Sequence, residues 1–108
     1  MIVLALAIAL QTAAPVEAPV PALLATDVCV ELQGRGRATI GEQRFSGLSL
    51  SRAVAQRIPA GRPLFIRFAN ERASSDIEGM AAAMAGAMSA PSIAIVETCE
   101  VAVEGDAQ

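Results

Sequence analysis

The sequence predicts a small α/β (α+β) protein with a mixed sheet of four to five strands and two helices on one face, in the order β-β-α-β-α-β(-β). Three observations support this prediction. Residues Asp27–Gln33 alternate between apolar and polar side chains, which is typical of a half-buried strand. Pro63–Ala69 and Ser92–Val96 are nearly all apolar, as in a strand covered by other elements. The segments before and between them have helical apolar spacing, and such crossovers make neighbouring strands parallel.

The first strand leads into a hairpin. Gly34–Gly36 forms a turn, and Arg37–Ile40 is a short second strand. Gly41 and Glu42 mark another turn, after which Gln43–Phe45 continues in extended conformation.

The first helix follows this hairpin. Either Ser49 or Ser51 is suited to cap its start, because a serine hydroxyl accepts a hydrogen bond from a free backbone N–H. Pro59 stops it. Its apolar face recurs at helical spacing and consists of Leu50, Val54 and Ile58.

The second helix is predicted to open with a capping box at Ser75–Glu78. Its apolar stripe is expected to pack on the sheet, with a binding groove as the alternative, and it comprises Ile77, Met80, Met84 and Met88. Gly79 and Gly86 weaken this helix. Beyond the last apolar strand, Cys99–Glu104 alternates again and either extends that strand or forms an edge strand.

The N-terminal region differs from the rest of the chain. Met1–Leu10 is an unbroken apolar run, about half the ~20 residues that a membrane-spanning helix needs. Its length suits the apolar part of a signal peptide, and the alternative is a buried core strand or helix. We therefore divide the chain into a signal-peptide-like segment (1–14), a Pro/Ala linker (15–25), a compact domain (26–104) and a loose tail (105–108).

Composition and charge argue against nucleic-acid binding. The net charge is −3, and the aromatic residues are three Phe with no Trp or Tyr, so base stacking is nearly excluded. Arg62, Arg67 and Arg72 surround the best strand. They are suited either to bind an anionic polymer or simply to form a solvated edge.

The sequence offers no catalytic, cofactor-binding or metal-binding residues that we can name. It has no His and only two Cys, so neither a zinc cluster nor an activated cysteine can be assembled. Asp76 and Glu78 are explained by the helix dipole, which favours acidic side chains at a helix start. We expect a protein without cofactors that is not an enzyme.

Cys29 and Cys99 are predicted to form a disulfide if the chain is exported. Closing a loop of that length would stabilise the fold by ~4 kcal/mol in the chain-entropy model. The alternative is two buried, unpaired thiols in neighbouring strands.

The succession of segments resembles the periplasmic domain of the ExbD/TolR biopolymer-transport family over residues 26–98. The resemblance is carried by the order and apolar spacing of DVCVELQ, ATIGEQRF, LSLSRAVAQRI, RPLFIRFAN, SSDIEGMAAAMAGAM and SIAIVET. Ala69-Asn70 stands where the family often has Ala-Asp. The family also has a spanning helix with a proton-coupling aspartate, whereas Met1–Val16 contains no acidic residue. No proton-coupling residue is therefore carried over.

The resemblance implies an exported, non-enzymatic interaction domain, periplasmic or secreted, that contacts a protein or cell-wall partner in the envelope and not nucleic acid. It admits a homodimer, and it places the chain at the membrane only through an uncleaved N-terminus. The alternative is an unrelated small secreted or periplasmic protein, stabilised by a disulfide, that acts as an inhibitor or adaptor.

Overall fold

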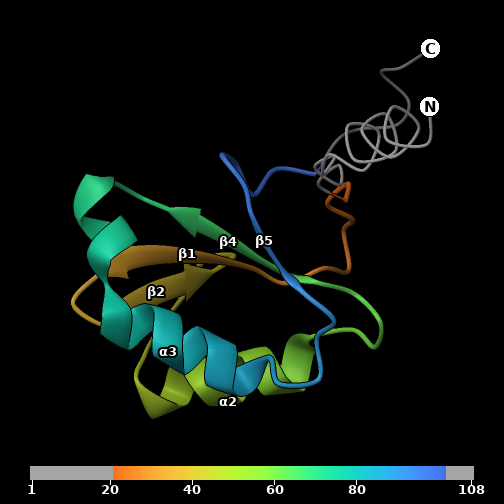
Figure 1. Cartoon of the computed structure of the whole chain (residues 1–108), viewed down its shortest axis with the longest axis horizontal. Helices are drawn as coiled ribbons and strands as arrows, with labels where there is room; N and C mark the ends of the chain where they lie inside the picture. Colours follow the sequence, from red (N-terminus) through yellow and green to blue (C-terminus); the bar gives the residue numbers. More distant parts are fainter. Residues whose placement is uncertain (1–20, 102–108) are drawn as a thin grey trace, which may run out of the picture.

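The computed structural model describes residues 21–101, which form one five-stranded mixed sheet with two helices against one face (Figure 1). This confirms the predicted fold class and element order. The signal-like segment 1–14, residues 15–20 of the predicted linker and the tail 105–108 lie outside the described residues. In chain order the elements are β1 (Cys29–Gly34), β2 (Arg37–Ile40), β3 (Gln43–Ser46), α2 (Leu48–Arg57), β4 (Leu64–Phe68), the 3-10 helix η1 (Glu71–Ser75), α3 (Ile77–Gly86) and β5 (Ile93–Ile95).

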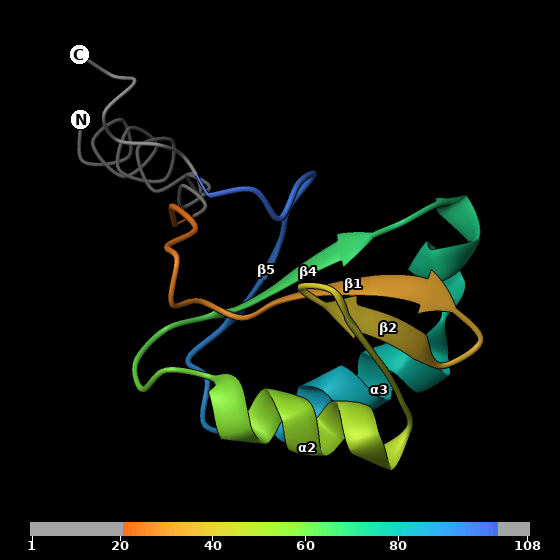
Figure 2. The same ribbon diagram turned by 180° about the vertical axis from the view of Figure 1, so that it is seen from behind.

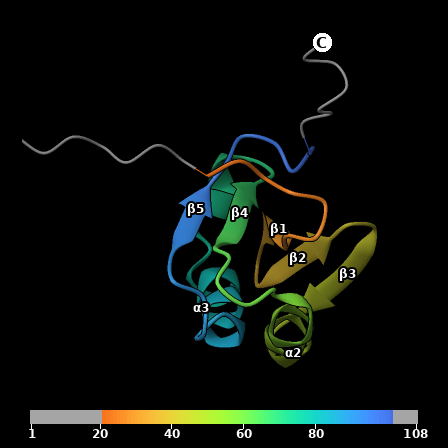
Figure 3. The same ribbon diagram turned by 90° about the vertical axis from the view of Figure 1, so that its right-hand side faces the viewer.

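The sheet has the spatial order β3-β2-β1-β4-β5. β1, β2 and β3 are joined by tight turns and pair antiparallel, while β4 is parallel to both β1 and β5. The predicted parallel pairing of the two most apolar strands is thus confirmed. Seen along the sheet, α2 and α3 lie side by side beneath it (Figure 3). Within residues 21–101, no helix has the length and apolar character required to cross a membrane.

The main core lies between the sheet and the two helices. Alternate residues of the central strands point to this face because side chains alternate along a strand. α2 contributes the face predicted from its apolar spacing. The largest fully buried side chains of this core are Val30, Leu32, Leu50, Val54, Leu64 and Ile66.

The opposite face of the sheet is also partly covered. Phe65 has no exposed surface although it alternates with the helix-facing Leu64 and Ile66. Its partner in the parallel register is Cys29, which is joined to Cys99 beyond β5. Residues 99–101, the described part of the expected strand Cys99–Glu104, form no strand. The reason is that the disulfide draws this segment across the sheet face instead of along its edge.

α3 packs with its smallest residues inward, and this overturns the prediction that its isoleucine and methionine stripe packs on the sheet. The buried residues of α3 are Gly79, Ala83 and Gly86. Ile77 is 83% exposed, Met84 47% and Met88 86%, and from the predicted stripe Met80 alone packs against the core.

The small residues face inward because they allow α3 to approach α2 closely. A Cβ on Gly86 would collide with the carbonyl oxygen of Ser51 and lie 2.8 Å from Cβ of Val54. In addition, the Ser51 hydroxyl donates a 2.7 Å hydrogen bond to the carbonyl of Ala82. Hydropathy alone could not choose this face, because α3 is apolar on nearly every side.

The predicted helix caps are corrected as well. Asp76, not Ser75, caps α3: its carboxylate accepts a hydrogen bond from the N–H of Gly79. At the start of α2 the N-cap is Gly47, with no side-chain cap. Ser49 instead exchanges hydrogen bonds with the backbone of Ser46. The 3-10 helix before α3 shifts the helix cap by one residue, from Ser75 to Asp76.

Gly86→Ala tests the close packing of the two helices. Helix propensity alone predicts a gain of about 1 kcal/mol. We expect instead a loss of about 1–3 kcal/mol, because the added methyl group overpacks the contact with Ser51 and Val54. Chemical denaturation measures the change, with Ala85→Gly as the control for propensity at an exposed position of α3. A more stable Gly86→Ala variant would contradict this packing.

Candidate functional site

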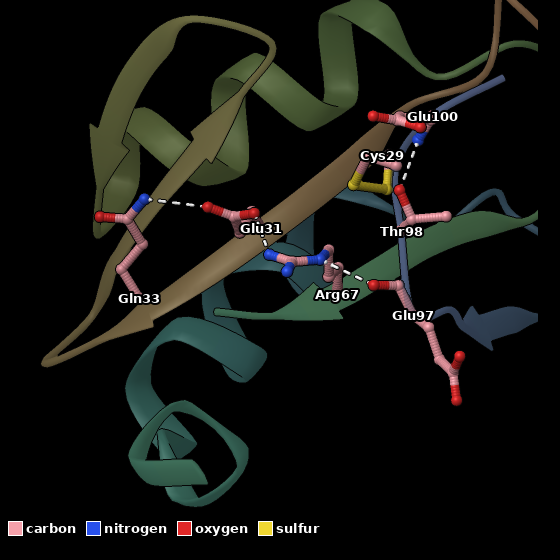
Figure 4. The surroundings of a disulfide bond; sticks show 8 residues. Cys29, Glu31, Gln33, Arg67, Glu97, Thr98 and Glu100 are labelled. Atoms are coloured by element: carbon pink, nitrogen blue, oxygen red, sulfur yellow. Dashed lines mark hydrogen bonds and ion pairs between the residues drawn. A yellow bond between two sulfur atoms is a disulfide. The ribbon is translucent and has the colours of Figure 1, made fainter. Parts of the chain in front are cut away.

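The predicted disulfide is present. Cys29 at the start of β1 is bonded to Cys99, 70 residues later in the chain. The bond fixes residues 97–100 over the face of the sheet opposite the helices (Figure 4). It closes a long loop, so it is expected to stabilise the fold by ~4 kcal/mol in the chain-entropy model. A structural disulfide is typical of proteins that reach an oxidising compartment.

Two of the three arginines around β4 hold chain segments together. Arg67 pairs with Glu31 of β1, and its Nε donates a 2.8 Å hydrogen bond to the carbonyl of Glu97 (Figure 4). Arg67 thus lies on the face of the sheet opposite the helices, half-buried and paired with Glu31. Arg62 forms a bidentate ion pair with Asp27. Its Nε lies 2.8 Å from Oδ1 and its Nη2 lies 2.7 Å from Oδ2.

The Asp27 carboxylate anchors the N-terminal described residues. Its side chain is fully buried, and it also accepts a 2.7 Å hydrogen bond from the N–H of Leu24. Arg62 additionally donates to the carbonyl of Ala22. The N-terminal and C-terminal described residues meet at the same end of the sheet (Figure 2). The hydrogen bond from Arg62 lowers the pKa of Asp27, and burial only partly opposes this.

The stability of the fold is expected to fall in acid partly through Asp27. A carboxyl group whose pKa is lowered in the folded state contributes stability above its unfolded pKa, about 3.9, and loses it as the pH falls through the folded value. We expect Asp27→Asn to have a shallower loss of unfolding free energy between pH 5 and pH 2. Urea denaturation across this range measures it, with the exposed turn residue Glu42→Gln as control. An unchanged pH slope in Asp27→Asn would contradict the assignment.

No group of three or more His, Cys, Asp or Glu side chains within residues 21–101 is placed to hold a metal ion. Asp76 and Glu78, explained from the sequence by the helix dipole, lie at the start of α3. Asn70, at the family's Ala-Asp position, caps η1 by accepting a 3.0 Å hydrogen bond from the N–H of Ala73. Asp76 and Asn70 therefore have structural hydrogen-bond partners.

The remaining candidate site begins at the β1–β2 turn. Gly34 pairs with Arg37, which leaves Arg35 and Gly36 as a two-residue loop. Both have positive φ, 56° and 75°, as in a type I′ turn. Such turns favour Asn-Gly because a Cβ is crowded by the backbone carbonyl at positive φ, and the short amide of asparagine offsets that cost by hydrogen-bonding to nearby backbone. Arg35 is the one non-glycine residue of positive φ within the described chain.

Asp76 fixes this turn against α3. Its Oδ1 and Oδ2 lie 3.0 and 3.1 Å from the N–H of Gly36, and Oδ1 also accepts from Gly79. One carboxylate thus joins residues 40 positions apart in the chain. Glycine is favoured at position 36 because its φ of 75° is a left-handed conformation that residues with a Cβ adopt only at a cost.

An open polar cavity of about 560 Å³ lies at this junction of turn, η1 and α3. Arg35, Arg37 and Arg72 line it, and all three are exposed. None of them forms an ion pair with a carboxylate in the part of the chain that the structure describes. Arg72 is therefore the member of the predicted arginine trio that belongs to this site.

An apolar groove of about 250 Å³ adjoins the polar cavity along α3. Ile77, Met80 and Met84 line it, and it shares Ser75, Asp76 and Ile77 with the cavity. We call the apolar groove the α3 groove, and the adjoining arginine-lined cavity its arginine end. The alternative interpretation of the methionine stripe as a binding groove agrees with this arrangement.

Sequence reasoning missed the arginine end. Arg35 and Arg37 lie in the β1–β2 hairpin and Arg72 in η1, far along the chain, so the side chain of Asp76 is what brings them together. The available signal was an arginine between two glycines, in a turn that would prefer asparagine.

Comparison with known proteins gives no match to any family model, to any curated protein or to any solved structure.

Arg35→Asn is expected to stabilise the protein by about 1 kcal/mol, because asparagine adopts the left-handed backbone conformation at lower cost than arginine. Thermal or urea denaturation measures the gain. Arg44→Asn, an exposed position within β3, serves as the control, and we expect no gain there because asparagine is disfavoured in strands. A destabilised Arg35→Asn variant would show that the Arg35 side chain supports the fold.

Proposed function

We propose that this chain is an exported, non-enzymatic interaction domain of the cell envelope that binds an extended segment of a partner protein in the α3 groove. The exposure of Ile77 and Met84 along a groove carries the proposal. A helix normally buries its large apolar side chains and exposes its small ones, whereas α3 does the reverse.

The exposed residues suit a protein partner. Methionine side chains are flexible and polarisable, which allows them to adapt to different apolar side chains. Because the groove continues into an arginine-lined cavity, it suits an occupant with an apolar group next to a polar one. Neighbouring side chains of an extended polypeptide provide this combination, whereas a uniformly charged polymer does not.

Two further features support export to the envelope. The apolar run Met1–Leu10 has the length of a signal-peptide core. The Cys29–Cys99 disulfide is of the kind that persists in an oxidising compartment. The resemblance to the ExbD/TolR periplasmic domain rests on the order of strands and helices, and on that basis we propose the same kind of non-catalytic role, in the periplasm.

In-cell photocrosslinking tests this function. A photoreactive amino acid at position 84, in the groove, should form an adduct with one defined segment of an envelope protein, identified by mass spectrometry. The same probe at position 98, an exposed site on the opposite face, should not. Ile77→Asp should abolish the adduct without unfolding the chain, because residue 77 is exposed and acidic residues are favourable at a helix start. Thr98→Asp is the matched charge control.

The alternatives give different results. Equal labelling from positions 84 and 98, or a cytoplasmic partner, would contradict the proposal. An adduct with cell-wall glycan or with a second copy of this chain would show that the groove has another occupant. A soluble enzyme as the crosslinked protein would favour the inhibitor or adaptor role.

A further inference from the structure

We propose that Arg35, Arg37 and Arg72 form a binding site for a carboxylate of the polypeptide that occupies the α3 groove. The proposal rests on the proposed function and specifies the chemistry of its partner. The bound segment would place an apolar side chain against Ile77 and Met84 and an acidic group at the arginine end.

Three guanidinium groups line one cavity although none has an acidic partner within residues 21–101. By contrast, Arg62 and Arg67 are engaged by Asp27 and Glu31. The backbone N–H groups of Gly36 and Gly79 are not available to an anion, because Asp76 already accepts from both. The arginine side chains are therefore the donors that a ligand would meet. Their planar guanidinium groups can bind a carboxylate in bidentate geometry.

The charge of the cavity favours a single carboxylate over a polyanion. Three arginines face the two carboxylates of Asp76 and Glu78, so the lining carries a formal charge of 3 − 2 = +1. A peptide carboxylate neutralises this charge. A phosphate dianion or an anionic polymer would bring more negative charge than the cavity offsets, next to the fixed carboxylate of Asp76.

The strain at Arg35 is independent support. Arginine occupies a left-handed turn position that asparagine or glycine would adopt more easily. Outliers of this kind are concentrated at functional sites, where the side chain has a use that offsets the strain. Here the side chain lines the cavity, and it makes no hydrogen bond or ion pair with the rest of the described chain.

Peptide selection on the full-length, oxidised chain tests the proposal even while the partner is unidentified. Peptides are selected from a random displayed library for binding that is lost in Ile77→Ser, a change that shortens the apolar side chain without adding a charge beside the arginines. We expect them to contain Asp or Glu close to an apolar residue. In synthetic versions of the best peptide, exchange of the acidic residue for its amide should weaken binding about tenfold or more, measured by fluorescence anisotropy.

A double-mutant comparison then assigns the effect to the arginines. The pair Arg37→Gln and Arg72→Gln should weaken binding of the acidic peptide about tenfold but leave binding of the amide peptide unchanged. Arg35→Asn should weaken the acidic peptide several-fold while the fold stays intact. The control pair Arg44→Gln and Arg52→Gln changes the net charge equally outside the cavity and should bind as the wild type does.

The outcomes separate the two proposals. Peptides that depend on Ile77 but show no acidic residue, or acidic peptides that the control pair weakens as much as the test pair, would overturn the carboxylate site and leave the groove function standing. Inorganic phosphate that displaces the peptide more strongly than chloride at equal ionic strength would also overturn it, in favour of a phosphate ligand. If no selected peptide depends on Ile77, the groove function itself fails.

Discussion

The arrangement of this domain depends on the carboxylate of Asp76. It caps α3 through Gly79 and at the same time accepts a hydrogen bond from Gly36 in the β1–β2 turn. This double attachment fixes where α3 begins and how the helix is rotated about its axis. Leu32 of β1 lies close to Gly79, so the helix start rests directly on the central strand. The close contact of Gly86 with Ser51 fixes the other end against α2.

The rotation of α3 creates the candidate site. With the small residues inward, Ile77 and Met84 remain on the surface beside the cavity that Arg35 and Arg37 line. The other face of the sheet has a separate structural role. There the disulfide and the ion pairs of Asp27 and Arg67 hold the ends of the described chain over Phe65. The disulfide and these ion pairs thus lie on one face of the sheet, whereas the main core and the α3 groove lie on the other.

The spacing of apolar residues predicted most of the fold, because the alternation of a strand and the residues of a short turn can be recognised within a few neighbouring positions. The strands around Ile66 and Ala94, the pairing of β4 with β5, and the buried face of α2 with Leu50 and Val54 were all predictable. The rotation of α3 was not, because its small and large apolar residues both recur at helical spacing. The polar end of the site was also hidden, since a hydrogen bond across 40 residues of sequence assembles it.

Native-state methionine oxidation measures the rotation of α3 most directly. Dilute peroxide followed by peptide mass spectrometry reports the oxidation rate of each methionine, and that rate follows the exposure of the sulfur. The structure predicts that Met84 and Met88 oxidise nearly as fast in the folded protein as in denatured protein, while Met80 is protected several-fold. Protection of Met84 and Met88 together with Met80 would place the methionine stripe against the sheet and contradict the account of the site.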